Sequence, residues 1–208
     1  MTTFKENRII LVGCDKDALN EIENSPYEII GYVSNNKKQF MEIAYLGDIR
    51  KGIEIASLSA GLLLISDDIE IRRYCFKQYS QYLVTHISSQ AQISKHSIIG
   101  KGSFIQSNCY VSYDVKIGDC CKINTGCYLH HDSEISNFSV LAPGVRLLGN
   151  VNVCTKTYVG ANTVVKQNCK IGSNTIIGMG SNVIKNIQDN VVAYGNPCKA
   201  IENNSSKT

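Results

Sequence analysis

The residues best suited to chemistry stand together in the stretch "LHHDSE" (129–134), where His130 and His131 precede Asp132. Histidine titrates near neutral pH, so it can accept a proton from an attacking amine or hydroxyl group. A neighbouring carboxylate can hold the imidazole in one tautomer. The same residues also occur as polar decoration of a turn, and the elements that hold them decide between the two interpretations.

An aliphatic residue recurs at every sixth position from Ile93 to Val183, at sixteen consecutive sites without a gap. The fifth position of each hexad is nearly always small or β-branched. A hexapeptide period predicts a β-helix solenoid in which three hexads form one triangular coil of about 18 residues. The aliphatic residues then fill the interior, and compact side chains pack near the corners. Four cysteines at the fifth position are expected to act there as small hydrophobic residues: Cys109, Cys121, Cys127 and Cys169.

This register places the opening stretch at a corner of a coil. Leu129 is the interior aliphatic residue of its hexad, and Ser133 takes the compact fifth position, so the three residues between them lie outside. One coil further, 18 residues after His131, stands Gly149, whose missing side chain lets a ligand approach the backbone. Its N–H is a candidate oxyanion donor. One strand earlier, Asn124 is placed to bond either the base or the acceptor.

Residues 1–86 follow a different pattern. Strands are expected at 8–13, 27–33, 61–66 and 83–87, with helical segments at 15–25 and 67–82. Strands that alternate with helices predict a small parallel α/β unit of Rossmann type, which binds ligands at the carboxyl ends of its strands. The residues expected there, as substrate-binding candidates, are Gly13, Asp15, Asp17, Ser34, Asn35 and Ser66.

The predicted organisation is α/β plus β: a Rossmann-like sugar-nucleotide-binding domain at 1–86 and a β-helix domain at 87–201. No flexible linker separates them, so we expect a fixed relation between the two. The polar tail at 202–208 is expected to be disordered.

Composition excludes several classes of protein. A net charge of +3 without a dense basic run gives no argument for nucleic acid as a partner. No apolar stretch approaches the ~18 residues of a membrane span, and no secretory leader is recognisable, so we expect a cytoplasmic protein that does not bind membranes. The nine cysteines include no C-x-x-C pair and no zinc-finger spacing to histidine, so no metal is expected.

Five stretches carry a family resemblance: "IN" (123–124), "HDS" (131–133), "LAPGVRLLGNV" (141–151), "IGMGSNVIKNI" (177–187) and "GNPCKAI" (195–201). With the two-part layout, they resemble the sialic acid O-acetyltransferase and bacillosamine-pathway N-acetyltransferase family of hexapeptide-repeat acyltransferases. The resemblance implies a left-handed parallel β-helix. It also implies acetyl-coenzyme A as co-substrate and a homotrimer with active sites between subunits.

The resemblance also assigns roles to residues. It makes His131 the general base, with Asp132, Asn124 and Gly149 assisting. Coenzyme A would lie in the groove between neighbouring β-helices. The positions expected to contact it are Val140, which stands where some members have a second histidine, and Gly149, Ala161, Met179, Lys185 and Lys199. In the first loop, "GCDKDA", Asp17 stands where the family often has a histidine, and an acidic loop is a poor cradle for phosphate.

The favoured function is N-acetylation of an amino group on a nucleotide-linked deoxy-amino sugar for surface glycan biosynthesis, because the small α/β domain suits such an acceptor. One alternative is O-acetylation of a sialic-acid-like sugar, and another is a non-catalytic scaffold or nucleotide-sugar-binding protein. A γ-type carbonic anhydrase needs three histidines on one zinc, and His96 lies nearly two coils from His130 and His131. We expect His86 and His96 to be structural or solvated, and leave the role of His130 open.

Overall fold

The computed structural model describes residues 5–23, 25–35, 40–51 and 59–204. Its N-terminal part is built on a parallel sheet of five strands in the order β3-β2-β1-β4-β5. The strands are β1 (Lys5–Val12), β2 (Glu28–Val33), β3 (Tyr45–Gly47), β4 (Ala60–Leu64) and β5 (Leu83–Val84). The long apolar runs of β1 and β4 suit strands that are covered on both faces.

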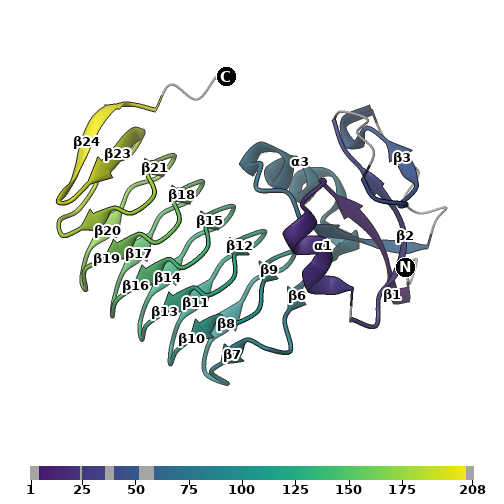
Figure 1. The fold of residues 1–208 in the computed structure, drawn as a ribbon, viewed down its shortest axis with the longest axis horizontal. Helices are drawn as coiled ribbons and strands as arrows, with labels where there is room; N and C mark the ends of the chain where they lie inside the picture. Colours follow the sequence, from purple (N-terminus) through teal and green to yellow (C-terminus); the bar gives the residue numbers. More distant parts are fainter. Residues whose placement is uncertain (1–4, 24, 36–39, 52–58, 205–208) are drawn as a thin grey trace.

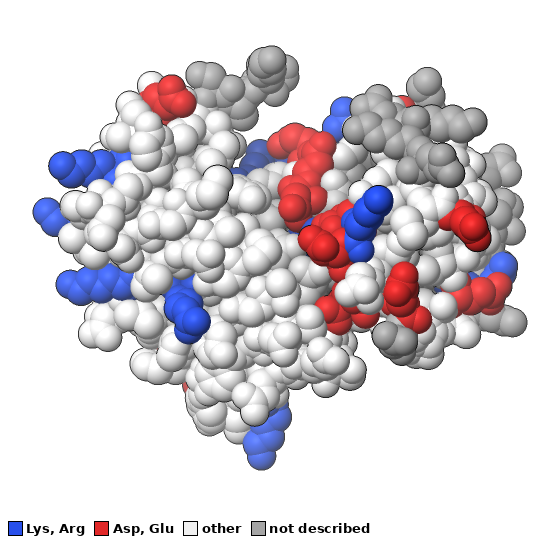
Figure 2. Space-filling model, viewed as in Figure 1, with Lys and Arg blue, Asp and Glu red and all other residues white. Residues whose placement is uncertain are grey.

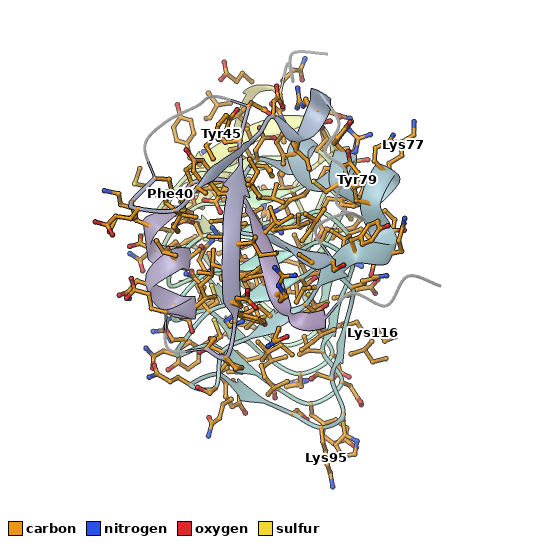
Figure 3. All side chains as sticks on the ribbon, turned by 90° about the vertical axis from the view of Figure 1, so that its right-hand side faces the viewer. Phe40, Tyr45, Lys77, Tyr79, Lys95 and Lys116 are labelled. Atoms are coloured by element: carbon orange, nitrogen blue, oxygen red, sulfur yellow. The ribbon has the colours of Figure 1, made fainter. Side chains whose placement is uncertain are left out.

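Helices cover the two faces of this sheet, α1 (Lys16–Ile22) on one side and α3 (Ile69–Tyr79) on the other (Figure 3). Two short 3-10 helices, η1 (Ile49–Lys51) and η2 (Ser80–Tyr82), complete the unit. Each α-helix starts just after a strand ends, and an aspartate begins it. Asp15 accepts from the N–H groups of residues 17 and 18, and Asp68 from those of residues 70 and 71.

Two apolar cores flank the sheet, and each also contains residues of the β-helix. Ile9 and Leu11 of β1 face α1, whereas Ile10 and Val12 face α3, as the two-residue period of a strand requires. Phe104 joins the core on the α1 side. Cys120 and, partly buried, Phe138 join the core on the α3 side. The N-terminal unit is therefore docked onto the β-helix through shared apolar packing.

The second part is a parallel β-helix of three ladders (Figure 1). Paired residues are 18 apart, as in Tyr110, Tyr128 and Arg146, so the predicted coil length is confirmed. One ladder holds β7 (Gln92–Ile93), β10 (Tyr110–Val111), β13 (Tyr128–Leu129), β16 (Arg146–Leu147), β19 (Val164–Val165) and β22 (Asn182–Val183). A second holds β8 (Ile98–Ile99), β11 (Lys116–Ile117), β14 (Glu134–Ile135), β17 (Asn152–Val153) and β20 (Lys170–Ile171). The third holds β6 (His86–Ile87), β9 (Phe104–Ile105), β12 (Lys122–Ile123), β15 (Val140–Leu141), β18 (Tyr158–Val159), β21 (Ile176–Ile177), β23 (Val191–Gly195) and β24 (Cys198–Asn203).

The first-position aliphatic residues from Ile105 to Val183 are buried, as predicted, and so are the four fifth-position cysteines. The fourth position of the hexad has a constraint of its own, because the backbone there is left-handed at corner after corner. Asp114, Asp132 and Asn150 have φ of 55°, 61° and 57°. Asparagine, aspartate and glycine tolerate this conformation best, so they predominate at these corners.

The expected strand at 83–87 divides between the two parts of the chain. Leu83 and Val84 form β5 of the N-terminal sheet, and His86 and Ile87 already pair with β9 in the β-helix. A single residue, Thr85, therefore separates the two sheets.

At the far end, β24 turns back on β23 in an antiparallel hairpin. The last coil is shorter than the others, because Ile177 pairs with Ala193, 16 residues on. β24 continues to Asn203, and the Asn204 side chain donates to the carbonyl of Asn174. These residues lie within the tail 202–208 that was expected to be disordered. Residues 205–208 lie outside the described part of the chain.

Candidate active site

His131 and Asp132 form a hydrogen-bonded pair at the corner between β13 and β14. His131 Nδ1 lies 2.8 Å from Asp132 Oδ2, and both side chains are more than half exposed. An ionised carboxylate only accepts, so the proton sits on Nδ1 and the Nε2 lone pair is left available. The left-handed backbone at Asp132 turns its carboxylate back toward the ring. The pair has the arrangement of a base with an orienting partner.

Gly149 lies directly beside the imidazole, as the 18-residue register predicted. A Cβ added to Gly149 would stand 2.6 Å from Cε1 and 2.7 Å from Nε2 of His131. Only glycine therefore leaves room for the ring in this position. The next N–H, that of Asn150, donates to the His131 carbonyl at 2.8 Å. Within the described residues, no protein acceptor is found for the N–H of Gly149 itself.

Asn124 lies at a different corner of the triangle, between β12 and β13. Its side chain is buried and donates to the Leu141 carbonyl at 2.8 Å. One strand separates it from His131, so the structure does not bring these two residues together within one chain.

The expected cofactor positions fall in three places. Ala161 lies at the same corner as Asn124, two coils on, where Met179 follows it by 18 residues with 81% of its surface exposed. Lys185 is exposed at the corner of His131, three coils on, and Lys199 is exposed on β24. Val140 is fully buried in β15, so its side chain cannot meet a cofactor in this structure, and we correct that expectation.

A small cavity of about 200 Å³ opens at the carboxyl ends of β1, β2 and β4. Four of the six expected substrate residues line it: Gly13, Ser34, Asn35 and Ser66. The close approach of Ser66 explains Gly13, because a Cβ there would lie 2.7 Å from the Cβ of Ser66, and its φ is +111°. Asp15 and Asp17 are not among the lining residues.

Asp15 instead binds a lysine that the sequence did not single out. Lys122, on β12, is fully buried, and its ammonium group contacts Asp15 Oδ2, lies 2.7 Å from Asp67 Oδ1 and donates to the Ile65 carbonyl at 2.8 Å. Burial alone raises the pKa of Asp15, but the hydrogen bond and the charge of Lys122 outweigh it, and the pKa is lowered overall. In the sequence, Lys122 occupies an outward strand position where a solvated lysine is the ordinary expectation.

Acidic side chains gather over the boundary between the two parts of the molecule (Figure 2). Asp15 and Asp68 occupy the N-termini of α1 and α3, whose N–H groups would otherwise be available to a phosphate. A diphosphate bound at this sheet edge must therefore find its donors elsewhere.

The remaining histidines do not form a metal site. His96 stacks on Tyr113 with ring centroids 4.2 Å apart, and His86 stacks on Phe104 at 4.7 Å. His130 lies edge-on to Tyr110 with ring centroids 6.3 Å apart. Among the described residues, no group of three or more His, Cys, Asp and Glu side chains is placed to hold a metal ion.

Comparison with known proteins gives a consistent result. Residues 96–131 match the family described as "Bacterial transferase hexapeptide (six repeats)". The chain is 42% identical over 55 residues to a galactoside O-acetyltransferase of Lactococcus lactis, which covers 26% of this chain and 27% of that one. It is 35% identical over 66 residues to an acyl-[acyl-carrier-protein]–UDP-N-acetylglucosamine O-acyltransferase of Pseudomonas paraeruginosa, covering 32% and 26%. The chain spans between 25% and 59% of the length of such curated relatives.

Solved structures resemble the whole chain. A histidine-to-asparagine variant of perosamine N-acetyltransferase from Caulobacter crescentus, in complex with CoA and GDP-perosamine, superposes with a TM-score of 0.83. The identity is 21%, over 96% of this chain and 99% of that one. The acetyltransferase domain of PglB from Neisseria gonorrhoeae, in complex with acetyl coenzyme A, gives 0.84 at 20% identity over 94% and 99%.

These comparisons confirm the resemblance to hexapeptide-repeat acyltransferases. The stacked parallel ladders fit the left-handed β-helix of that class, and the likeness in fold extends over nearly the whole chain. The CoA and acetyl-CoA complexes of the structural neighbours support the same class of co-substrate here. Separately, no helix in the described ranges is long and apolar enough to cross a membrane.

Proposed function

We propose that the chain is an acetyl-CoA-dependent sugar acetyltransferase that acetylates the amino group of a nucleotide-linked deoxy-amino sugar for surface glycan biosynthesis. The observation that carries the proposal is the exposed His131–Asp132 pair, with Nδ1 2.8 Å from the carboxylate and Gly149 against the ring. Acyl transfer from a thioester needs a base more than an acid, because a thiolate leaves readily. The corner supplies a base in the required tautomer.

In the proposed mechanism, His131 Nε2 takes a proton as the sugar amine attacks the thioester carbonyl. Asp132 holds the other ring nitrogen and stabilises the imidazolium. The Gly149 N–H, which has no acceptor within the described residues, is the proposed donor to the oxyanion. The tetrahedral intermediate then collapses with loss of the coenzyme A thiolate, which takes up the proton from His131. The products are the acetamido sugar and the free thiol.

The proposed site lies between subunits of a homotrimer. His131 and Lys185 share one corner of the triangle, whereas Ala161 and Met179 share another. The face between these corners carries Tyr128, partly exposed with the guanidinium of Arg146 4.6 Å from its ring centre, and such a face can pack against a second copy. Packing that brings one corner of a chain beside the other corner of its neighbour assembles the base and the cofactor groove.

For the acceptor, we propose the cavity at the carboxyl edge of the N-terminal sheet. At about 200 Å³ it is smaller than a typical pocket for a whole ligand, which is about 300 Å³ or more. It would hold one part of a nucleotide-linked sugar and leave the amino sugar to extend toward a catalytic corner. The neighbour solved with GDP-perosamine supports this class of acceptor.

An acceptor screen tests the proposal. The protein is incubated with acetyl-CoA and a panel of nucleotide-linked 3-amino and 4-amino sugars plus free sialic acids, and thiol release is followed. Release with a nucleotide-linked amino sugar is expected. His131→Ala should lower kcat by about 10²–10⁴, while the adjacent His130→Ala, with the same change of side chain, serves as control. Near-parental turnover by a folded His131→Ala protein would contradict the assignment.

Selective turnover of free sialic acids would favour O-acetylation of a sialic-acid-like sugar. The occupied helix N-termini at Asp15 and Asp68 favour this alternative, because they remove two ready phosphate sites. No release with any acceptor would favour a non-catalytic nucleotide-sugar-binding protein or scaffold.

A further inference from the structure

Lys122 is a buried cation with three protein partners, all of them in the N-terminal unit. Its strand, β12, belongs to the β-helix, and its side chain is 0% exposed. Asp15 follows β1, and both Asp67 and the Ile65 carbonyl follow β4. One ammonium group therefore joins two loops that are about 50 residues apart in sequence to a third segment in the other part of the molecule.

The same two loops form one side of the cavity at the sheet edge. Gly13 and Cys14, just before Asp15, line the cavity, and so do Ser66 and Asp68 on either side of Asp67. The other oxygen of Asp15 caps α1. Both loops thus alternate residues that face the cavity with residues that bind Lys122.

A second buried cation makes the reverse connection. Arg72, on α3, is fully buried and donates to the carbonyls of Leu64 and Ser66 at 2.8 and 2.7 Å. It also donates to the Cys120 carbonyl of the β-helix at 3.1 Å. The loop after β4 is therefore held by one cation from each part of the molecule.

We propose that Lys122 is a positioning residue for the acceptor. By holding the loops after β1 and β4, it shapes the cavity and fixes it relative to the β-helix. The inference rests on the proposed function, in which this cavity receives the acceptor. Lys122 touches neither cofactor nor reacting atoms, so its effect falls on acceptor binding.

Geometry favours positioning over a simple contribution to stability. Buried ion pairs generally stabilise a fold little more than apolar residues of the same size, whereas they specify one arrangement of the groups that they join. The neighbouring outward positions of the same ladder carry apolar side chains, Phe104 before and Val140 after Lys122. An apolar residue would therefore also fit the pattern at position 122, but it would leave the two loops untied.

The test compares Lys122→Met with Lys116→Met. Lys116 occupies the same position one hexad earlier and is exposed at the edge of the molecule (Figure 3). With an acceptor found in the screen, Lys122→Met is expected to raise KM for the acceptor about tenfold or more and to leave KM for acetyl-CoA within about twofold. Lys116→Met should change neither. An unchanged acceptor KM in folded Lys122→Met would overturn the proposal, as would an equal rise in both KM values.

Amide hydrogen exchange tests the proposal without any acceptor. In Lys122→Met, exchange at residues 13–15 and 66–68 should be faster, whereas the β-helix corner at 130–133 should be unchanged. Uniform exchange rates across parent and variant would reject the role of Lys122 even if the acceptor screen succeeds. Faster loop exchange with no turnover of any acceptor would instead reject the proposed function alone.

If Lys122→Met does not fold, Asp67→Ala replaces it. This variant keeps Lys122 paired with Asp15 and removes only the contact to the loop after β4, where the carboxylate is half exposed. Faster exchange at 66–68 and a severalfold higher acceptor KM are expected. Parental values in both measurements would overturn the proposal.

Discussion

The imidazole of His131 is held in place by a missing side chain below it and a carboxylate beside it. Gly149→Ala tests the first contact. The added Cβ would lie within 2.7 Å of two ring atoms, so the ring must swing away. We expect kcat to fall at least about tenfold, or ~1.4 kcal/mol of transition-state stabilisation, while the melting temperature changes by a few degrees. Parental kcat with a folded protein would show that the ring position is not important.

Asp132→Asn tests the second contact. Asparagine tolerates the left-handed φ of 61°, so the corner should keep its shape. Its amide can donate to Nδ1, which favours the tautomer that carries the proton on Nε2 and removes the base. A fall in kcat of roughly tenfold or more, with KM for acetyl-CoA unchanged, is expected in steady-state assays. Loss of thermal stability without loss of turnover would assign Asp132 a role in the turn alone.

Residue by residue, the period of six predicted which side chains are interior and which face out. It therefore placed Gly149 against His131 before any coordinates were needed. The left-handed fourth position was also readable, because asparagine, aspartate and glycine recur there. Lys122 was not readable, because its partners lie in loops that meet it only after the two parts dock. Asn124 shows the same limit, since one strand of separation in sequence becomes a separate corner in space.

At the scale of elements, the junction between α1 and the first coils contains a buried histidine. His86 Nδ1 lies 3.3 Å from the Tyr27 hydroxyl, while Nε2 has no hydrogen-bond partner within the described structure. Burial lowers the pKa of His86, and the Glu21 carboxylate, 4.0 Å from Nε2, opposes the shift only in part. The imidazole is therefore preferentially neutral in the folded protein.

This lowered pKa has a definite sign for stability. The unfolded chain binds the proton more readily, so the contribution of His86 is complete above its unfolded pKa of about 6.5 and is lost as the pH falls below it. We expect the melting temperature to fall between pH 7.5 and 5.5, and to fall less in His86→Phe, which can keep the stacking on Phe104. The exposed His96→Phe is the matched control. Equal pH slopes in all three proteins would refute the assignment.

The elements themselves were largely predictable. Apolar runs marked β1, β2 and β4, and helical spacing marked α3, although the short strand β3 (Tyr45–Gly47) was not foreseen because three residues give no period. The run at 83–87 looked like one strand, but it serves two sheets. The composition of the tail suggested disorder, whereas pairing with β23 orders it as far as Asn203. In both cases, contacts distant in sequence override a local pattern.

For the whole molecule, the proposed site between subunits can be tested by mixing two inactive variants. His131→Ala removes the base at one corner, and Ala161→Trp obstructs the other. If each site takes one corner from each of two chains in a closed trimer, every mixed trimer contains one intact site. Refolding a 1:1 mixture should then restore roughly a quarter of the parental site density. Absence of any recovery, with trimers seen by sedimentation, would place both corners' functions within one chain.

The uninterrupted stacking of coils also gives this molecule a built-in measure of length. Lys185 stands three coils from His131 at the same corner, and coils stack about 4.8 Å apart, so the two residues are separated by roughly 14 Å along the axis. That separation can change only in whole steps of 18 residues, because any other insertion would turn interior side chains outward. Evolution can therefore adjust the span from the base to the far end of the solenoid only by an integer number of coils. An extended cofactor that fits one span would miss the next by the thickness of a strand.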